Sequence, residues 1–105
     1  MSYEKLVRDK IPEIIRSNGE EPEIRILSDE EYKKELEKKL LEEYHEVLDA
    51  TGASRIEELA DMVEVMISLA ALEEKKLDDI IAVADKKREK RGGFKEKIYL
   101  KSVKR

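Results

Sequence analysis

Cysteine is missing from this chain, and aromatic residues make up only 5% of its 105 positions. The lack of cysteine excludes disulfide scaffolds, thiolate zinc sites and cysteine nucleophiles. No apolar run reaches the roughly 18 residues that a membrane helix needs, and the opening residues MSYEKLVRDK do not have the pattern of a signal peptide. We therefore expect a soluble, cytoplasmic protein without a membrane partner.

An excess of positive charge is also lacking, although charged residues make up 46% of the chain. The 26 acidic residues and the 22 lysines and arginines are interspersed and leave a net charge of -4. A protein that binds a nucleic-acid polymer through its charge is expected to be basic, so this class of partner is disfavoured. The length suits one small domain over residues 1–105. The scarcity of large apolar side chains favours a core that is completed by self-association.

Turn and capping signals divide the chain into helices. Pro12 is placed to open a short helix, which the Asn-Gly pair at 18–19 can close. Ser28 and Glu31 form a capping box, which predicts a long helix from about residue 29 to the Thr-Gly pair at 51–52.

Two more helices are predicted in the second half of the chain. Ser54 and Glu57 form another capping box, so a helix is expected over about residues 55–74. A further helix is expected over about residues 77–91, where the glycine pair at 92–93 ends it.

Two segments alternate apolar and polar side chains as a strand does: PEIRIL at 22–27 and FKEKIYLKSV at 94–103. They can pair as a small antiparallel two-stranded ribbon, about residues 22–27 with 96–101. The predicted fold class is all-α: antiparallel helices complete a helical bundle by oligomerisation, and the ribbon is added to it.

Four carboxylates form two pairs with a three-residue spacing, Glu43 with Glu46 and Glu58 with Asp61. On a helical wheel of about 100° per residue, Glu58 and Asp61 share a line with Val65, away from the main apolar face of their helix. That main face consists of Ile56, Leu59, Val63, Met66 and Ala70. Glu43 lies on a line that is otherwise leucine and valine, and Glu46 lies on its flank. Lines with apolar members are expected to pack, so these acids should be partly buried.

Inward-facing carboxylates cannot all stay ionised unless they are paired or bound to a metal, because an uncompensated buried charge costs several kcal/mol. Two adjacent helices joined by the tight turn ATGAS would bring all four acids into one oxygen cage. Such a cage favours Mg2+ or Mn2+. The alternative is that the acids form salt bridges on solvated helix faces, since an isolated E-x-x-E pair is common in a glutamate-rich chain.

The segments KLLEEYHE and EELADMVEV resemble the E-x-x-E and E-x-x-D motifs of the all-α nucleotide pyrophosphohydrolases. That superfamily includes MazG proteins, phosphoribosyl-ATP pyrophosphohydrolase and the dimeric dUTPases. KLVRDKIPEII, RILSDEEY and KRGGF resemble its small single-domain branch, which is MazG-like or phosphoribosyl-ATP pyrophosphohydrolase-like. The likeness extends over almost the whole chain.

The resemblance implies a helical fold that completes its core as a homodimer or homotetramer. It also implies Mg2+-dependent cleavage of a nucleoside triphosphate between the α and β phosphates, which releases a monophosphate and pyrophosphate, as in house-cleaning enzymes. The residues that match the metal-binding acids are Glu43, Glu46, Glu58 and Asp61. In the mechanism that we predict, a water attacks phosphorus and passes its proton to Glu43 or Glu46 as the catalytic carboxylate.

The basic end of the last predicted helix supplies candidate phosphate ligands. Arg88 and Arg91 extend its apolar line, and Lys87 lies on the flank. MazG proteins carry an N-x-K…R-R pattern here, which Lys87 and the pair Lys90-Arg91 resemble. Asp85 replaces the asparagine, so it is either a further metal ligand or a residue that orients water. The alternative is that these cations only offset the helix macrodipole.

Lys39 and Arg8 are also candidates for contact with substrate phosphate, from the flank of the first long helix and from the basic N-terminal segment. A solvated surface charge is the alternative for both. Two other functions remain open. One is the phosphoribosyl-ATP pyrophosphohydrolase of histidine biosynthesis. The other is a non-enzymatic dimeric helical interaction module, which would not respond to Mg2+.

Overall fold

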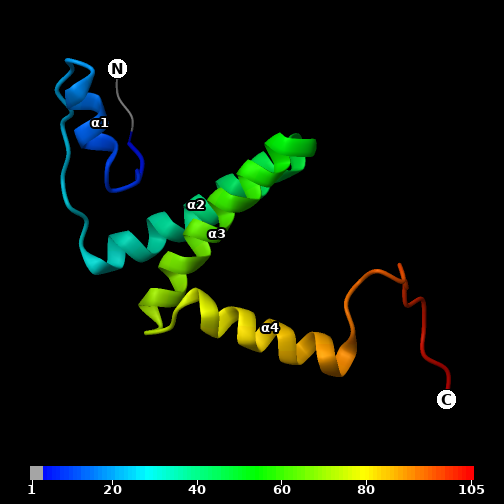
Figure 1. Cartoon of the computed structure of the whole chain (residues 1–105). Helices are drawn as coiled ribbons and strands as arrows, with labels where there is room; N and C mark the ends of the chain where they lie inside the picture. The colour runs from blue at the N-terminus through cyan, green and yellow to red at the C-terminus, as the bar shows by residue number, and fades with distance from the viewer. Residues whose placement is uncertain (1–3) are drawn as a thin grey trace.

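The computed structural model describes residues 4–105, and its regular secondary structure there is entirely α-helical. In chain order, the helices are α1 Ile11–Ser17, α2 Asp29–Asp49, α3 Gly52–Leu72 and α4 Leu77–Arg91. The all-α class is therefore confirmed. α2 and α3 lie side by side as an antiparallel hairpin, whereas α4 leads away from that hairpin (Figure 1).

α1 is bounded by the predicted proline and glycine signals. Pro12 occupies the first turn, where its missing N–H removes no helical hydrogen bond. Gly19 follows the helix with a φ of +84°, a left-handed conformation that favours glycine. Its N–H donates to the carbonyl of Arg16 at 3.0 Å, which closes the last turn.

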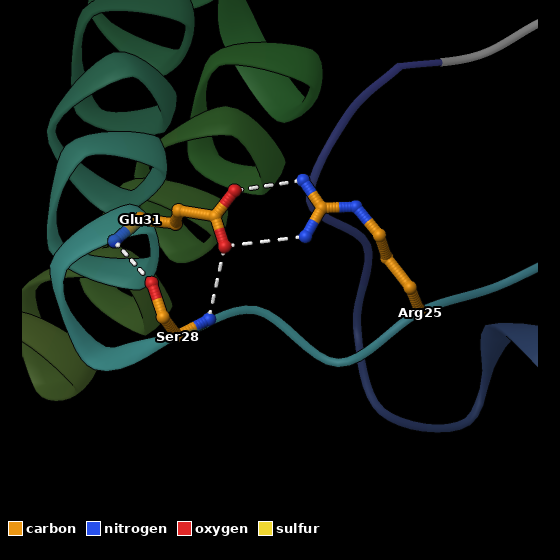
Figure 2. Close-up of polar contacts among 3 residues, drawn as sticks. All are labelled: Arg25, Ser28 and Glu31. Carbon is orange, nitrogen blue, oxygen red and sulfur yellow. Dashed lines mark hydrogen bonds and ion pairs between the residues drawn. The ribbon is translucent and has the colours of Figure 1, made fainter.

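The first turn of α2 is held by the predicted capping box (Figure 2). The N–H of Glu31 donates to Ser28 Oγ at 3.2 Å, and Glu31 Oε1 accepts from the N–H of Ser28 at 3.1 Å. Arg25 adds two bonds to the same carboxylate, Nη1 to Oε1 at 3.2 Å and Nη2 to Oε2 at 2.8 Å. The guanidinium of Arg25, followed by the N–H of Ser28, lowers the pKa of Glu31 to about 2. These bonds tie the segment at 22–27 to the start of α2.

The connection between α2 and α3 is shorter than predicted. α3 begins at Gly52, and its N-cap residue Thr51 makes no side-chain capping bond. The prediction of a capping box from Ser54 and Glu57 is wrong, because Ser54 already lies inside the helix. Gly52 has a φ of +58°, which lets the chain reverse within a few residues. Arg55 Nε then donates to the carbonyl of the α2 C-cap residue at 2.9 Å.

The seam between α2 and α3 contains the buried apolar side chains of the described chain. Leu36 of α2 is 4% exposed and Val65 of α3 is 8% exposed. Leu36 belongs to the helix line of Glu43, and Val65 belongs to the line of Glu58 and Asp61. The two partly acidic lines therefore pack against each other, as the sequence predicts.

Other apolar surface remains open in the single chain. Ile56 and Leu59, from the expected main apolar face of α3, are 66% and 40% exposed. The Cα radius of gyration is 18.4 Å, whereas a compact domain of this length has about 13 Å. The chain is thus an elongated hairpin with extensions at both ends (Figure 1).

α4 ends at Arg91, and its C-cap residue Gly92 has a φ of +82°, as the glycine pair predicts. Residues 94–105, called the exposed arm below, are irregular and begin with a turn at 94–97. In the part of the chain that the structure describes, neither 22–27 nor 96–101 is a strand, and Figure 1 shows them at opposite ends of the molecule. Their pairing as a ribbon stays a prediction.

Among residues 4–105, no helix combines the length and the apolar content that a membrane span requires.

The capping box predicts a measurable loss when its hydroxyl is removed. Ser28→Ala should lower the free energy of unfolding by about 1 kcal/mol, because the N–H of Glu31 loses its acceptor. Urea unfolding followed by helical circular dichroism measures this loss. Ser54→Ala is the matched control and should stay within about 0.5 kcal/mol of wild type. An equal loss in both variants would contradict the boundaries of α3.

Candidate metal centre

Three carboxylates from the two helices of the hairpin converge. Glu43 of α2 and Glu58 and Asp61 of α3 each offer an oxygen that lies within 4.8 Å of the other two, and all three residues are half-buried. The three-residue spacing places the two α3 acids on one face, and Val65, one turn further on, buries that face against α2. Glu46 is exposed and lies outside this group. The structure therefore brings together three of the four predicted metal ligands.

The convergence raises the pKa of two members of the group, Glu43 and Glu58. Desolvation, followed by repulsion from Asp61 and Glu58, raises the pKa of Glu43, and the charge of Lys39 opposes that rise. Desolvation also raises the pKa of Glu58, together with repulsion from Glu46 and Asp61. The charge of Glu46 therefore raises the pKa of Glu58, although Glu46 lies outside the group of three carboxylates. A bound cation would relieve these strained carboxylates.

The donor set fits a hard divalent cation. Carboxylate oxygens are the ligands that Mg2+ and Mn2+ prefer, and these oxygens come from two helices that pack against each other. Mg–O bonds are about 2.1 Å long, so two ligands of one octahedral ion lie about 3–4 Å apart. The three carboxylate oxygens, within 4.8 Å of one another, are already close to that separation.

A groove of about 610 Å³ opens beside Glu43 and Asp61. Its volume falls in the range of small-molecule sites, about 300–1,000 Å³. The segment 5–11 forms one wall, and α2 and α3 form the others. The side chains that α2 and α3 contribute, besides the two acids, are Tyr32, Leu36, Lys39, Glu64, Val65 and Ser68.

Arg8 reaches from the N-terminal wall of the groove to α3. Its Nη2 lies 2.7 Å from Asp61 Oδ1, and its Nη1 lies 3.9 Å from Glu64 Oε1. The Arg8 and Asp61 side chains are 58% and 44% exposed, and ion pairs of this kind stabilise a fold by only about 0–1 kcal/mol. Because the ion pair is weak, Arg8 could exchange it for a contact with another anion, and Asp61 could exchange it for a contact with another cation. The sequence suggested Arg8 as a phosphate ligand but not its contact with Asp61.

The other predicted cations differ in their distance from the acids. Lys39 is half-buried in the groove, and its Nζ lies 3.2 Å from Glu42 Oε2. By contrast, no α4 residue lines this groove in the described chain. Arg88 Nη1 lies 3.2 Å from Asp85 Oδ1 of its own helix, so the structure gives Asp85 a partner away from the carboxylate group. Two other cations of α4, Lys87 and Arg91, are exposed.

Sequence reasoning did not select three of the groove residues, Tyr32, Glu64 and Ser68. A signal existed for Ser68, because it shares the helix line of Glu58 and Asp61. Its hydroxyl donates to the carbonyl of Glu64 at 3.1 Å. Glu64 is exposed, and it also approaches Arg8.

No protein-family model matches the chain, and no solved structure matches it. An uncharacterized protein of Mycolicibacterium smegmatis is 56% identical to it over 43 residues. This stretch covers 41% of the chain and 44% of the relative, so the chain matches less than half of the relative's length. The chemistry of the site must therefore be argued from its own residues.

The raised pKa values predict that mild acid stabilises the protein. A carboxyl whose pKa is higher in the folded than in the unfolded chain binds its proton more tightly when folded. The free energy of unfolding should therefore rise as the pH falls from 7 through the raised pKa of Glu43, until the gain is complete below its ordinary value of 4.5. Below that pH the lowered pKa of Glu31 acts in the opposite direction, and its contribution is lost towards pH 2.

Melting temperatures measured between pH 7 and pH 5, without divalent cations and at one protein concentration, test this expectation. Glu43→Gln should melt higher than wild type at pH 7 and should show a smaller rise on acidification. Glu37→Gln removes the same charge from an exposed position of α2 and should keep the wild-type profile. A Glu43→Gln profile of melting temperature against pH that parallels wild type would show that folding does not raise the pKa of Glu43.

Proposed function

We propose that this chain is an Mg2+-dependent nucleotide pyrophosphohydrolase of the MazG-like type. It would cleave a nucleoside triphosphate between the α and β phosphates to give a monophosphate and pyrophosphate. The observation that carries the proposal is the convergence of Glu43, Glu58 and Asp61 beside a groove that is also lined by basic side chains. A polyphosphate needs both kinds of group, because a metal ion and basic side chains must together offset its several negative charges.

The residues divide this work between them. Glu43, Glu58 and Asp61 would hold Mg2+, which would offset charge on the phosphates and on the leaving pyrophosphate. Arg8 and Lys39, which both line the groove, would contact phosphate oxygens, and the guanidinium suits bidentate contact with phosphate. Arg8 leaves Asp61 when substrate enters, since their exposed ion pair is weak.

A carboxylate accepts the proton of the attacking water. Glu43 is the favoured acceptor, because of the two candidate carboxylates it is the one that lines the groove in which the phosphates would lie. Glu46 is the alternative, one turn further along α2 and exposed. Lys87, Arg88 and Arg91 belong to a helix that does not line the groove. They would contact the same substrate only if a second copy brought its α4 to the site.

The chain is also proposed to act as a homodimer or homotetramer. The support is its open apolar surface, which a partner copy would cover. Besides Ile56 and Leu59, the exposed large apolar side chains of α2, α3 and α4 are Leu41, Tyr44, Leu48, Leu72, Ile81 and Val83. An assembly of this kind would complete the bundle that the hairpin begins.

A nucleotide panel tests the activity. Canonical, deoxy and damaged nucleoside triphosphates and phosphoribosyl-ATP are incubated with and without Mg2+, and released pyrophosphate is converted to phosphate by added inorganic pyrophosphatase. Signal should require both Mg2+ and the added enzyme. Glu43→Gln should lower kcat/KM by about 10²–10⁴-fold, because it removes a metal ligand and the favoured base. Glu37→Gln, on the same helix, should leave the rate unchanged.

Each outcome of the panel favours one function. Hydrolysis of phosphoribosyl-ATP alone would favour the histidine-pathway enzyme over the house-cleaning type. No signal from any substrate, together with a melting temperature that Mg2+ does not raise, would favour the interaction module. For a true site, Mg2+ at about ten times its Kd should add about 1.4 kcal/mol of stability, or about 5–11 °C.

Self-association is tested separately by sedimentation equilibrium at micromolar concentration. Wild type should be a dimer or tetramer. Ile56→Glu should weaken the assembly by about 100-fold or more, since each copy would lose an apolar contact of about 1.5–3 kcal/mol. Lys33→Glu introduces the same residue at an exposed position of α2 and should have little effect. A strictly monomeric wild type would contradict the proposal.

A further inference from the structure

Two exposed segments of the chain have matching patterns but do not meet. In the segment at 22–27, Ile24 and Ile26 are two residues apart and are 54% and 88% exposed. In the exposed arm, Ile98 and Leu100 are also two residues apart and are 85% and 74% exposed. Side chains two apart fall on one face of an extended strand, so each segment offers one apolar face that the single chain does not cover.

The charges of the two segments are complementary. Glu20, Glu21 and Glu23 surround the start of the first segment. Its arginine, Arg25, is already paired with Glu31 (Figure 2). The exposed arm has one acid, Glu96, and an excess of basic residues: Lys95, Lys97, Lys101, Lys104 and Arg105.

One antiparallel register satisfies both patterns. If Ile24 lies opposite Leu100, then Ile26 lies opposite Ile98 on the same face. On the other face, Glu23 lies opposite Lys101. A shift by two residues in either direction places Ile24 or Ile26 opposite a polar side chain, Ser102 or Glu96.

The geometry of the chain separates these partners. α4 has 15 residues and is therefore about 22 Å long. It leads away from the hairpin and carries the exposed arm to the end of the molecule opposite the segment at 22–27 (Figure 1). That segment is in turn held at the start of α2 by the bonds between Arg25 and Glu31. Pairing within one chain would require α4 to fold back across the hairpin.

We infer that the exposed arm of one copy pairs with residues 22–27 of a second copy, in the register that places Ile26 opposite Ile98. In a two-fold dimer the exchange is mutual, and each copy both gives and receives an arm. The ribbon is a form of strand addition, in which backbone hydrogen bonds provide affinity and alternate side chains provide register. Because an isolated two-stranded ribbon is marginal in water, the inference rests on the proposed self-association.

Cysteine cross-linking tests the exchange, and the chain has no native cysteine to interfere. A tagged Ile26→Cys protein is mixed with an untagged Ile98→Cys protein, allowed to exchange subunits, and oxidised mildly. A disulfide-linked species with one tagged and one untagged chain is expected. Glu23→Cys with Lys101→Cys is a second pair, which samples the other kind of position in an antiparallel ladder. Ile26→Cys with Val103→Cys is the control, since these positions would lie about 16 Å apart and beyond disulfide reach.

Three results would overturn the inference. The first is a double variant, Ile26→Cys with Ile98→Cys, that forms a bridge within one monomer, because the ribbon would then be intramolecular. The second is the absence of cross-linking in both register pairs while sedimentation shows a dimer, which leaves self-association intact but removes the exchange. The third is a monomeric wild type, which removes both.

Discussion

The packing of α2 against α3 is the constraint on which the rest of the molecule depends. Leu36 of α2 and Val65 of α3 are both buried where the two helices pack, and both belong to helix lines that also bear acids. Apolar contact therefore forces Glu43 towards the carboxylates of α3. The raised pKa values of Glu43 and Glu58 are the electrostatic consequence of that contact. The proposed Mg2+ would offset the repulsion among these acids.

The N-terminal segment supplies a provisional counter-charge to this centre. Arg8 contacts Asp61 at 2.7 Å and approaches Glu64, so part of the acidic charge is offset before any ligand arrives. The pair is exposed and hence weak. In the proposed function, Arg8 would exchange its contact with Asp61 for a contact with a phosphate.

The single chain covers only part of its own apolar surface. The hairpin seam is covered, but the remaining apolar faces and the exposed arm are open. Self-association would cover the faces, and exchange of the arm would pair two segments that the chain keeps at opposite ends. The proposed site and the proposed assembly are linked, because the α4 cations lie outside the groove of their own chain. Through its α4, a second copy would add positive charge to that of Lys5, Lys10 and the other basic side chains of the groove.

The sequence by itself determined the helices and the inward-facing acids. The turn at Gly19 and the capping box at Ser28 depend on contacts within a few residues, and so they could be predicted. The start of α3 could not be predicted. The Thr-Gly pair at 51–52 indicated the end of one helix and Ser54 indicated the start of the next, whereas α3 begins at Gly52. Only the tertiary structure decided that Glu46 lies outside the carboxylate group, and that Arg8 contacts Asp61 across 53 positions of sequence. Those outcomes depend on how α2 is rotated against α3 and on the course of the N-terminal segment, which no local pattern of residues encodes.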